Sequence, residues 1–140
     1  MSSARSLGKK NGQATFSPFG SPDSTYKSLE KDKLVIHMDR IATLNEVLSQ
    51  DPNNAFARYG LAMEFANSGQ TEQALAEFSK LLSANPDYAA GYFMAAQTLV
   101  KVDRIDEAKT MLQNGITAAQ RKGDSHAASE MQGMLDEIGG

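Results

Sequence analysis

The chain has no cysteine, no tryptophan, only two histidines and no long apolar run. The absence of cysteine excludes disulfides, a thiolate nucleophile and cysteine-ligated zinc. His37 and His126 lie far apart, and neither belongs to a metal-binding spacing such as HExxH. No stretch approaches the roughly 18 apolar residues that cross a bilayer. We therefore expect no metal, no cofactor and no membrane span.

Acidic side chains outnumber basic ones in all but the N-terminal part of the chain. Residues 1–31 carry five basic and two acidic side chains, a net charge of +3, whereas residues 32–140 carry nine basic and fifteen acidic ones, a net charge of −6. An acidic region repels a phosphate backbone unless its few cations cluster. Nucleic acid is therefore not expected as the main partner, and only the N-terminal segment could make weak contacts with a polyanion.

Residues 1–31 are predicted to form a disordered tail. They are rich in Ser, Gly, Pro and Lys, and residues 17–22 are a run of turn formers. The tail lacks the apolar centre of a secretory signal peptide, which favours a cytoplasmic location. An organellar transit segment stays open as an alternative, because no acidic residue precedes Asp23. A cloning-derived or mis-assigned start, reaching to about residue 37, is the other alternative.

The strongest signal is an internal repeat with a period of 34 residues. Residues 51–59, DPNNAFARY, align with residues 85–93, NPDYAAGYF. The register persists through small, aromatic and aliphatic positions, with Ala62 over Ala96, Ala74 over Ala108, Phe78 over Leu112 and Leu82 over Ile116. A period of this length is typical of stacked helical or solenoid architectures.

Each repeat contains two helical patterns separated by a break. In the first repeat, apolar residues recur at steps of three and four from Phe56 to Ala66, and a second stripe runs from Ala74 to Leu82. Pro86 ends this stripe because proline lacks an amide donor. Asp87 and Asp103 are expected to cap the helices that follow them. Both repeats, over about 53–86 and 87–120, are therefore predicted to be helical hairpins.

These residues resemble the tetratricopeptide repeat family, in the form of a small bacterial-type domain. The match comprises Leu61, Ala62, Phe65, Ala74, Phe78 and Pro86 in the first repeat, and Ala95, Ala96, Leu99, Ala108 and Leu112 in the second. The alanines are explained by the close approach of the two helices of a hairpin. Arg58 replaces the usual aromatic residue, and Gln120 replaces the closing proline, so the helix before Gln120 is expected either to run on or to turn differently into the next helix.

Helical stripes also flank the two repeats, from Leu34 to Leu48 and from Ala127 to Ile138. A solenoid needs covers on its end repeats, since bare hairpins would leave apolar surface in water. The predicted fold class is all-α: residues 32–140 form an α-solenoid of antiparallel helix hairpins, with two full repeats and a capping helix at each end. Six helices are expected at about 34–50, 54–67, 71–84, 88–101, 105–121 and 124–138.

The resemblance implies that function lies in a concave groove lined by the first helix of each repeat. The groove residues implied are Phe56, Tyr59, Met63, Asn67, Ala90, Phe93, Met94, Gln97 and Lys101. Some of the aromatic residues among them are expected to pack in the core instead. The family's carboxylate-clamp type uses Lys and Asn side chains where this chain has Tyr59 and Met63, then Phe93 and Gln97, so that activity is not expected.

The sequence favours a non-enzymatic module that binds a protein or peptide partner. An apolar or amphipathic peptide or helix fits an aromatic and methionine-lined groove. The alternative is a self-association element, which forms a homodimer through an exposed apolar face or by exchange of a helix. No enzyme is expected: Asp124, Ser125 and His126 are neighbours in sequence, and neighbours on a helix face different ways.

Overall fold

The computed structural model describes residues 22–139, with side chains from Glu30 onward, so residues 1–21 of the predicted tail lie outside the described residues. Within this range the helices are α2 (Pro22–Gln50), α3 (Ala55–Asn67), α4 (Thr71–Ala84), α5 (Ala89–Lys101), α6 (Ile105–Lys122) and α7 (Ser125–Gly139). No strand occurs among these residues. The predicted all-α fold of six helices is therefore confirmed for the described part of the chain.

The chain divides into two units, Met1–Ile36 and His37–Gly140, and helix α2 contributes to both. Helix α2 begins at Pro22 and not near residue 34, so residues 22–31 are helical where a disordered tail was expected. Proline suits the first position of a helix, and the Lys- and Glu-bearing sequence that follows has good helix propensity. The helix was predicted too short because this stretch has no apolar stripe.

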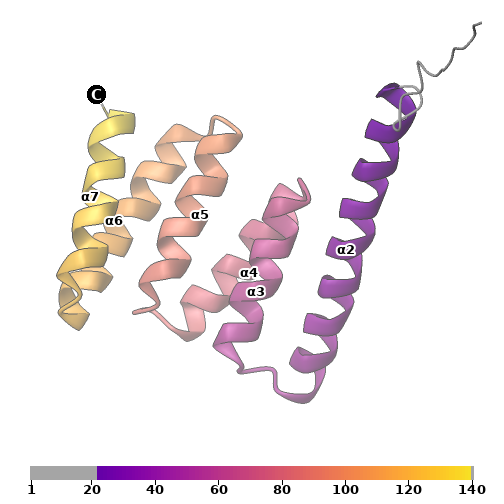
Figure 1. The fold of residues 1–140 in the computed structure, drawn as a ribbon. Coiled ribbons are helices and arrows are strands. Elements are labelled where there is room, and N and C mark those ends of the chain that lie inside the picture. The colour runs from indigo at the N-terminus through magenta and orange to yellow at the C-terminus, as the bar shows by residue number, and fades with distance from the viewer. Residues whose placement is uncertain (1–21, 140) are drawn as a thin grey trace, which may run out of the picture. The chain divides into compact units, whose positions relative to one another are not determined.

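The second unit is built from two antiparallel helix hairpins and a further helix. Helix α3 packs against α4, α5 packs against α6, and α7 packs on α6. Helices α3, α5 and α7 form one layer, and α4 and α6 form the other (Figure 1). The surface formed by α3, α5 and α7 is called the α3–α5–α7 face. It corresponds to the side that the sequence predicted to carry the groove.

Small residues lie in the core between the helices of each hairpin. Ala62, Ala74, Ala96 and Ala108 are all fully buried, as expected if the helices approach closely there. Phe78 and Leu81 fill the core beside the first hairpin, and Leu112 and Met131 fill the core beneath α7. The C-terminal half of α2 covers the other end, with Leu48 buried against Ala57 and Leu61 of α3. The packing of α2 and α7 on the ends of the hairpins therefore gives a physical reason for the capping role that the sequence predicts for them.

The turns between helices correct two of the predicted caps. Asp87 does not cap α5, because its carboxylate accepts a hydrogen bond from Nε of Arg121 at 2.7 Å. Asp103 does not cap α6: it has a φ of 61° and closes α5, with its amide donating to the carbonyl of Val100 at 3.0 Å. Helix α6 runs on past Gln120 to Lys122, which is the first of the two alternatives for the missing proline.

Candidate functional site

A hollow of about 280 Å³ opens on the α3–α5–α7 face. It is called the Phe93 hollow. Its walls come from α3, from α5 and from α7 with the turn before it, and are formed by Tyr59, Ala89, Ala90, Phe93, Met94, Asp124, His126, Ala127, Glu130 and Met131. Most of this lining is apolar. The hollow therefore offers a recess for an apolar group on the face that the sequence predicted to be functional.

Four of the nine predicted groove residues line this hollow: Tyr59, Ala90, Phe93 and Met94. The other five lie outside its lining. Phe56 is 79% exposed at the start of α3. Met63 packs against the buried cluster around Ala62, Gln97 is half-buried, and Asn67 and Lys101 are exposed at the ends of α3 and α5. Four of the predicted groove residues thus form one hollow, and the other five lie outside it on the same layer of helices.

Tyr59 belongs both to the hollow and to the core. Its ring meets Phe78 edge-on at a centroid distance of 6.4 Å and lies 5.5 Å from the ring of Tyr88. Burial, followed by the neighbouring Tyr88, raises the pKa of the Tyr59 phenol above 10.0. Tyr59 is therefore a neutral, firmly packed wall of the hollow at physiological pH.

Helix α7 and the turn before it supply half of the lining. Sequence reasoning missed this contribution because it treated α7 only as a capping helix. The signal was present in the repeat itself. Adding the 34-residue period to Ala90, Phe93 and Gln97 gives Asp124, Ala127 and Met131, and all three line the hollow. Helix α7 therefore stands where the first helix of a third repeat would stand.

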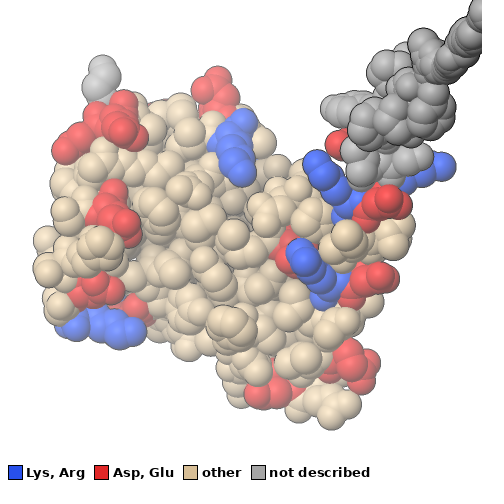
Figure 2. Space-filling model, viewed as in Figure 1, with Lys and Arg blue, Asp and Glu red and all other residues tan. Residues whose placement is uncertain are grey.

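The charged side chains of α3 turn away from the hollow. Arg58 pairs with Glu77 of α4 at 2.6 Å, and Glu64 lies 2.6 Å from Nδ1 of His37 on α2. His37 is half-buried in this contact. Figure 2 shows that uncharged side chains cover most of the α3–α5–α7 face and that charged ones lie mainly at its margins.

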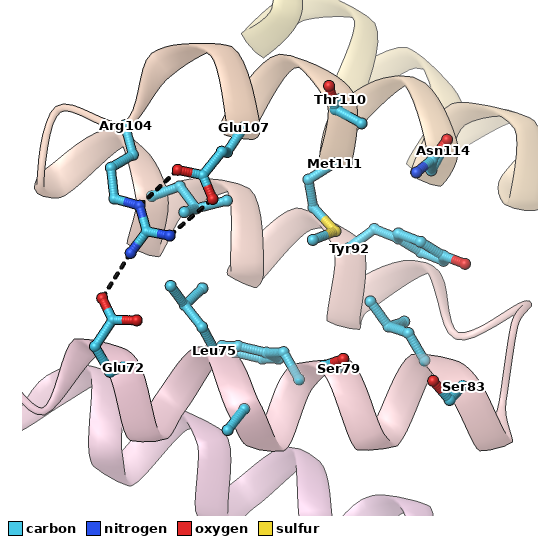
Figure 3. A pocket seen from close by; sticks show the side chains of 14 residues that line it. Glu72, Leu75, Ser79, Ser83, Tyr92, Arg104, Glu107, Thr110, Met111 and Asn114 are labelled. Carbon is cyan, nitrogen blue, oxygen red and sulfur yellow. Dashed lines mark hydrogen bonds and ion pairs between the residues drawn. The ribbon is translucent and has the colours of Figure 1, made fainter.

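A second and larger hollow, of about 720 Å³, lies between α4 and α6 and was not predicted. It is called the Met111 hollow. Figure 3 shows its apolar floor of Leu75, Tyr92 and Met111, with Ser79 and Ser83 on α4 facing Thr110 and Asn114 on α6. It lies where the backbones of α4 and α6 stand apart, with α5 packed against both helices. No sequence pattern predicted this hollow, since many of its residues lie at the edges of the apolar stripes of their helices.

Arg104 closes one end of the Met111 hollow. Its Nη1 donates to Oε2 of Glu72 at 2.6 Å, and its Nε donates to Oε2 of Glu107 at 2.7 Å (Figure 3). The hydrogen bond with Glu107 raises the pKa of Arg104, and the same bond lowers the pKa of Glu107. Because its charge is already matched by two carboxylates, this arginine is a poor anchor for an anionic ligand.

Neither hollow holds a cluster suited to a metal. Among the residues whose side chains are described, no three His, Cys, Asp or Glu side chains come together in such a group. No helix in the described part of the chain is both long and apolar enough to span a bilayer.

The fold and the repeat together define a solenoid of paired helices, and comparisons with known proteins identify its family. A tetratricopeptide repeat family model matches residues 65–130. The structure of a tetratricopeptide repeat domain protein from Salinibacter ruber is 31% identical, with a TM-score of 0.59, and the match covers 62% of this chain and 88% of that one. The chain belongs to the tetratricopeptide repeat family, so the resemblance predicted from its residues is confirmed.

Two further proteins extend the comparison. A TPR repeat-containing protein of Pseudomonas aeruginosa is 24% identical over 98 residues, which is 70% of this chain and 93% of that protein. The crystal structure of PcrH in complex with the chaperone binding region of PopD is 18% identical, with a TM-score of 0.67, and the match covers 87% of this chain and 96% of that one. The second likeness is one of fold.

Proposed function

We propose that this protein is a non-enzymatic interaction module that binds an apolar or amphipathic peptide or helix on the α3–α5–α7 face. The observation that carries the proposal is the Phe93 hollow, where Tyr59, Phe93, Met94 and Met131 from three helices form one recess. Met131 is already buried, whereas Phe93 and Met94 are half-buried, and their exposed apolar surface gains free energy when a partner excludes water from it, at about 25 cal/mol per Å².

The size of the hollow favours an anchoring side chain over a small metabolite. Its volume of about 280 Å³ falls below the range of roughly 300–1,000 Å³ that is usual for pockets holding whole small molecules. A single apolar side chain of a bound peptide suits such a recess. The exposed ring of Phe56 adds apolar surface on the same layer, as expected for a contact that continues along a peptide.

A structure of similar fold supports a protein or peptide as the partner. In a structure of similar fold, PcrH holds the chaperone binding region of PopD. For the present chain, the residues at the clamp positions favour an apolar segment over a terminal carboxylate, because Tyr59 and Phe93 stand where a Lys and Asn set would be needed. The proposed location is the cytoplasm.

The proposal is tested by selecting binders from a displayed peptide library with the full chain and measuring their affinities by fluorescence anisotropy. Ala90→Lys places a long charged side chain at the exposed edge of the Phe93 hollow, and we expect it to weaken binding at least about tenfold, because this side chain obstructs the recess that the apolar anchor would enter. Ser79→Lys, in the Met111 hollow, is the matched control and should bind as the wild type does. Equal loss in both variants, or no loss in Ala90→Lys, contradicts the proposal.

A second variant pair addresses the aromatic walls. Tyr59→Ala with Phe93→Ala removes both rings from the lining and should abolish binding of the selected peptides. Because Tyr59 also packs on Phe78, circular dichroism must show that the double variant is folded. If the double variant is not folded, the single variant Phe93→Ala is used in its place.

Self-association is the second candidate function, and α2 supplies the observation that favours it. Ile41, Leu44 and Leu48 pack toward α3, whereas Met38 and Val47 of the same helix are 57% and 38% exposed. Burial of this apolar surface against a second copy would form a homodimer. Sedimentation equilibrium at micromolar concentration tests it: Met38→Glu should turn a dimer into a monomer, and a monomeric wild type excludes it.

A further inference from the structure

We propose that the segment bound on the α3–α5–α7 face is cationic, with a lysine or arginine close to the apolar side chain that enters the Phe93 hollow. This inference rests on the proposed function and adds the charge of the partner to it. Its basis is the uneven lining of the hollow. The α5 wall is apolar, whereas the α7 wall contains two carboxylates, Asp124 and Glu130.

The two carboxylates are spaced to meet cationic groups on one short segment. Six positions separate them, which corresponds to about 9 Å along a helix axis. One oxygen of Asp124 accepts a hydrogen bond from the amide of Ala127 at 3.0 Å. An ionised carboxylate offers about four lone-pair sites, so this single bond leaves acceptor capacity for a ligand. Glu130 is 55% exposed and lies 3.5 Å from Nε2 of His126, which is itself 85% exposed.

Helix α7, which forms one wall of the hollow, carries acidic and no basic side chains apart from His126. From Asp124 to the C-terminal end of the chain there are four acidic residues and no lysine or arginine. Figure 2 shows acidic side chains along the α7 margin of the face, with basic side chains at its lower end. The nearest basic residues in sequence are Arg121, which pairs with Asp87, and Lys122, and neither lines the hollow. The α7 side therefore attracts cations and repels acidic peptides.

The partner is thus an amphipathic segment whose apolar side chain lies against Phe93, Met94 and Met131 while a cationic side chain reaches Asp124 or Glu130. Because these carboxylates lie at a rim, their contribution is expected in specificity and salt dependence more than in total affinity. Each exposed pair of this kind changes a binding constant by roughly 1.5-fold to fivefold, so two pairs are measurable together.

The test compares two versions of the strongest peptide selected by the full chain, with both residues flanking its apolar anchor changed either to Lys or to Glu. Affinities are measured by anisotropy at pH 8, where imidazole side chains are ordinarily neutral, in about 50 mM and about 300 mM salt. We expect the Lys version to bind at least about fivefold more tightly at low salt, and the difference to shrink at high salt.

Matched variants locate the effect. Asp124→Asn with Glu130→Gln removes both carboxylates of the lining, and should abolish the preference for Lys over Glu; asparagine keeps the ability to cap α7. Asp136→Asn with Glu137→Gln removes the same charge from exposed positions outside the lining, and should keep the preference. An equal loss in both double variants would overturn the proposal, because net charge alone would then explain it.

The remaining outcomes separate this inference from the function on which it rests. If both peptide versions bind equally and Phe93→Ala abolishes the binding of both, the face binds apolar segments but their charge is irrelevant, and only the present inference fails. If the selection yields no binder, or if Phe93→Ala leaves all binding intact, the proposed function fails as well.

Discussion

Arg58 donates a hydrogen bond of 2.6 Å to Glu77, and this pair joins the two helices of the first hairpin. Glu77 is buried, with only 9% of the residue exposed, and Arg58 also donates to the carbonyl of Pro52 at 3.2 Å. Arg58 stands where the family usually has an aromatic residue, so an ion pair here replaces an apolar contact. This substitution makes the first hairpin sensitive to the loss of one partner.

Arg58→Ala is therefore expected to destabilise the protein by about 2 kcal/mol, because it leaves a buried carboxylate paired with Lys80 alone among the described side chains. Urea denaturation followed by circular dichroism measures the change. Lys80→Ala is the control and should cost less than about 1 kcal/mol, since Lys80 is 61% exposed. The double variant Arg58→Leu with Glu77→Met should recover most of the loss.

Gly115 of α6 is predicted to tolerate no side chain. A Cβ atom at this position would lie 2.5 Å from Sδ of Met131 and 2.6 Å from Cβ of Tyr92, so the buried Met131 side chain would have to rearrange and α5 would have to shift. We expect Gly115→Ala to destabilise the protein by about 1–3 kcal/mol despite the better helix propensity of alanine. Gly133→Ala on α7 meets nothing within 4 Å and should stabilise it by up to about 1 kcal/mol. Equal effects of the two changes would contradict this account.

The pH dependence of stability should report the burial of Tyr59. Its folded pKa is raised above 10.0, so the unfolded chain releases this proton first as the pH rises. The contribution of Tyr59 is thus fully present below pH 10 and is lost as the pH rises toward the folded pKa. Unfolding in urea at pH 8 and near pH 11 should show a smaller loss for Tyr59→Phe than for the wild type. Tyr92→Phe, which leaves Tyr59 in place, should keep the wild-type loss.

The cap of α7 is expected to depend on hydrogen bonding more than on charge. Asp124→Ala removes the acceptor for the amide of Ala127 and should cost about 1 kcal/mol. Asp124→Asn keeps an acceptor and should change stability by less than about 0.5 kcal/mol. Hydrogen exchange of the first turn of α7 locates the effect, and similar exchange rates in the two variants would show that the cap is unimportant.

The repeat makes most of the fold predictable from the sequence. Helices α3 to α7 begin and end within one residue of their predicted bounds, because apolar periodicity and turn residues agree at each boundary. The start of α2 at Pro22 was missed since its first turns have no apolar stripe. Asp103 was misread as a cap because a single non-glycine residue with positive φ is not visible in a residue pattern; it occupies the repeat position of Gly69, which also has positive φ.

The candidate site was less predictable than the fold. Tyr59, Ala90, Phe93 and Met94 follow from the register of the first helices, and they do share one hollow. Met63 packs on the core cluster instead, because the sequence pattern does not resolve which side of a broad apolar stripe faces solvent. The Met111 hollow depends on the separation of α4 and α6, a distance between helices that no local pattern encodes.

The 34-residue period puts Tyr59, Phe93 and Ala127 at equivalent places on α3, α5 and α7. Two of these places hold a ring and the third holds a methyl group, and all three border the Phe93 hollow. An aromatic residue at position 127 would occupy that recess with the protein's own side chain. Solenoids of this kind can therefore gain or lose a specificity pocket by one substitution on an outer helix, while the stacking of the hairpins stays the same.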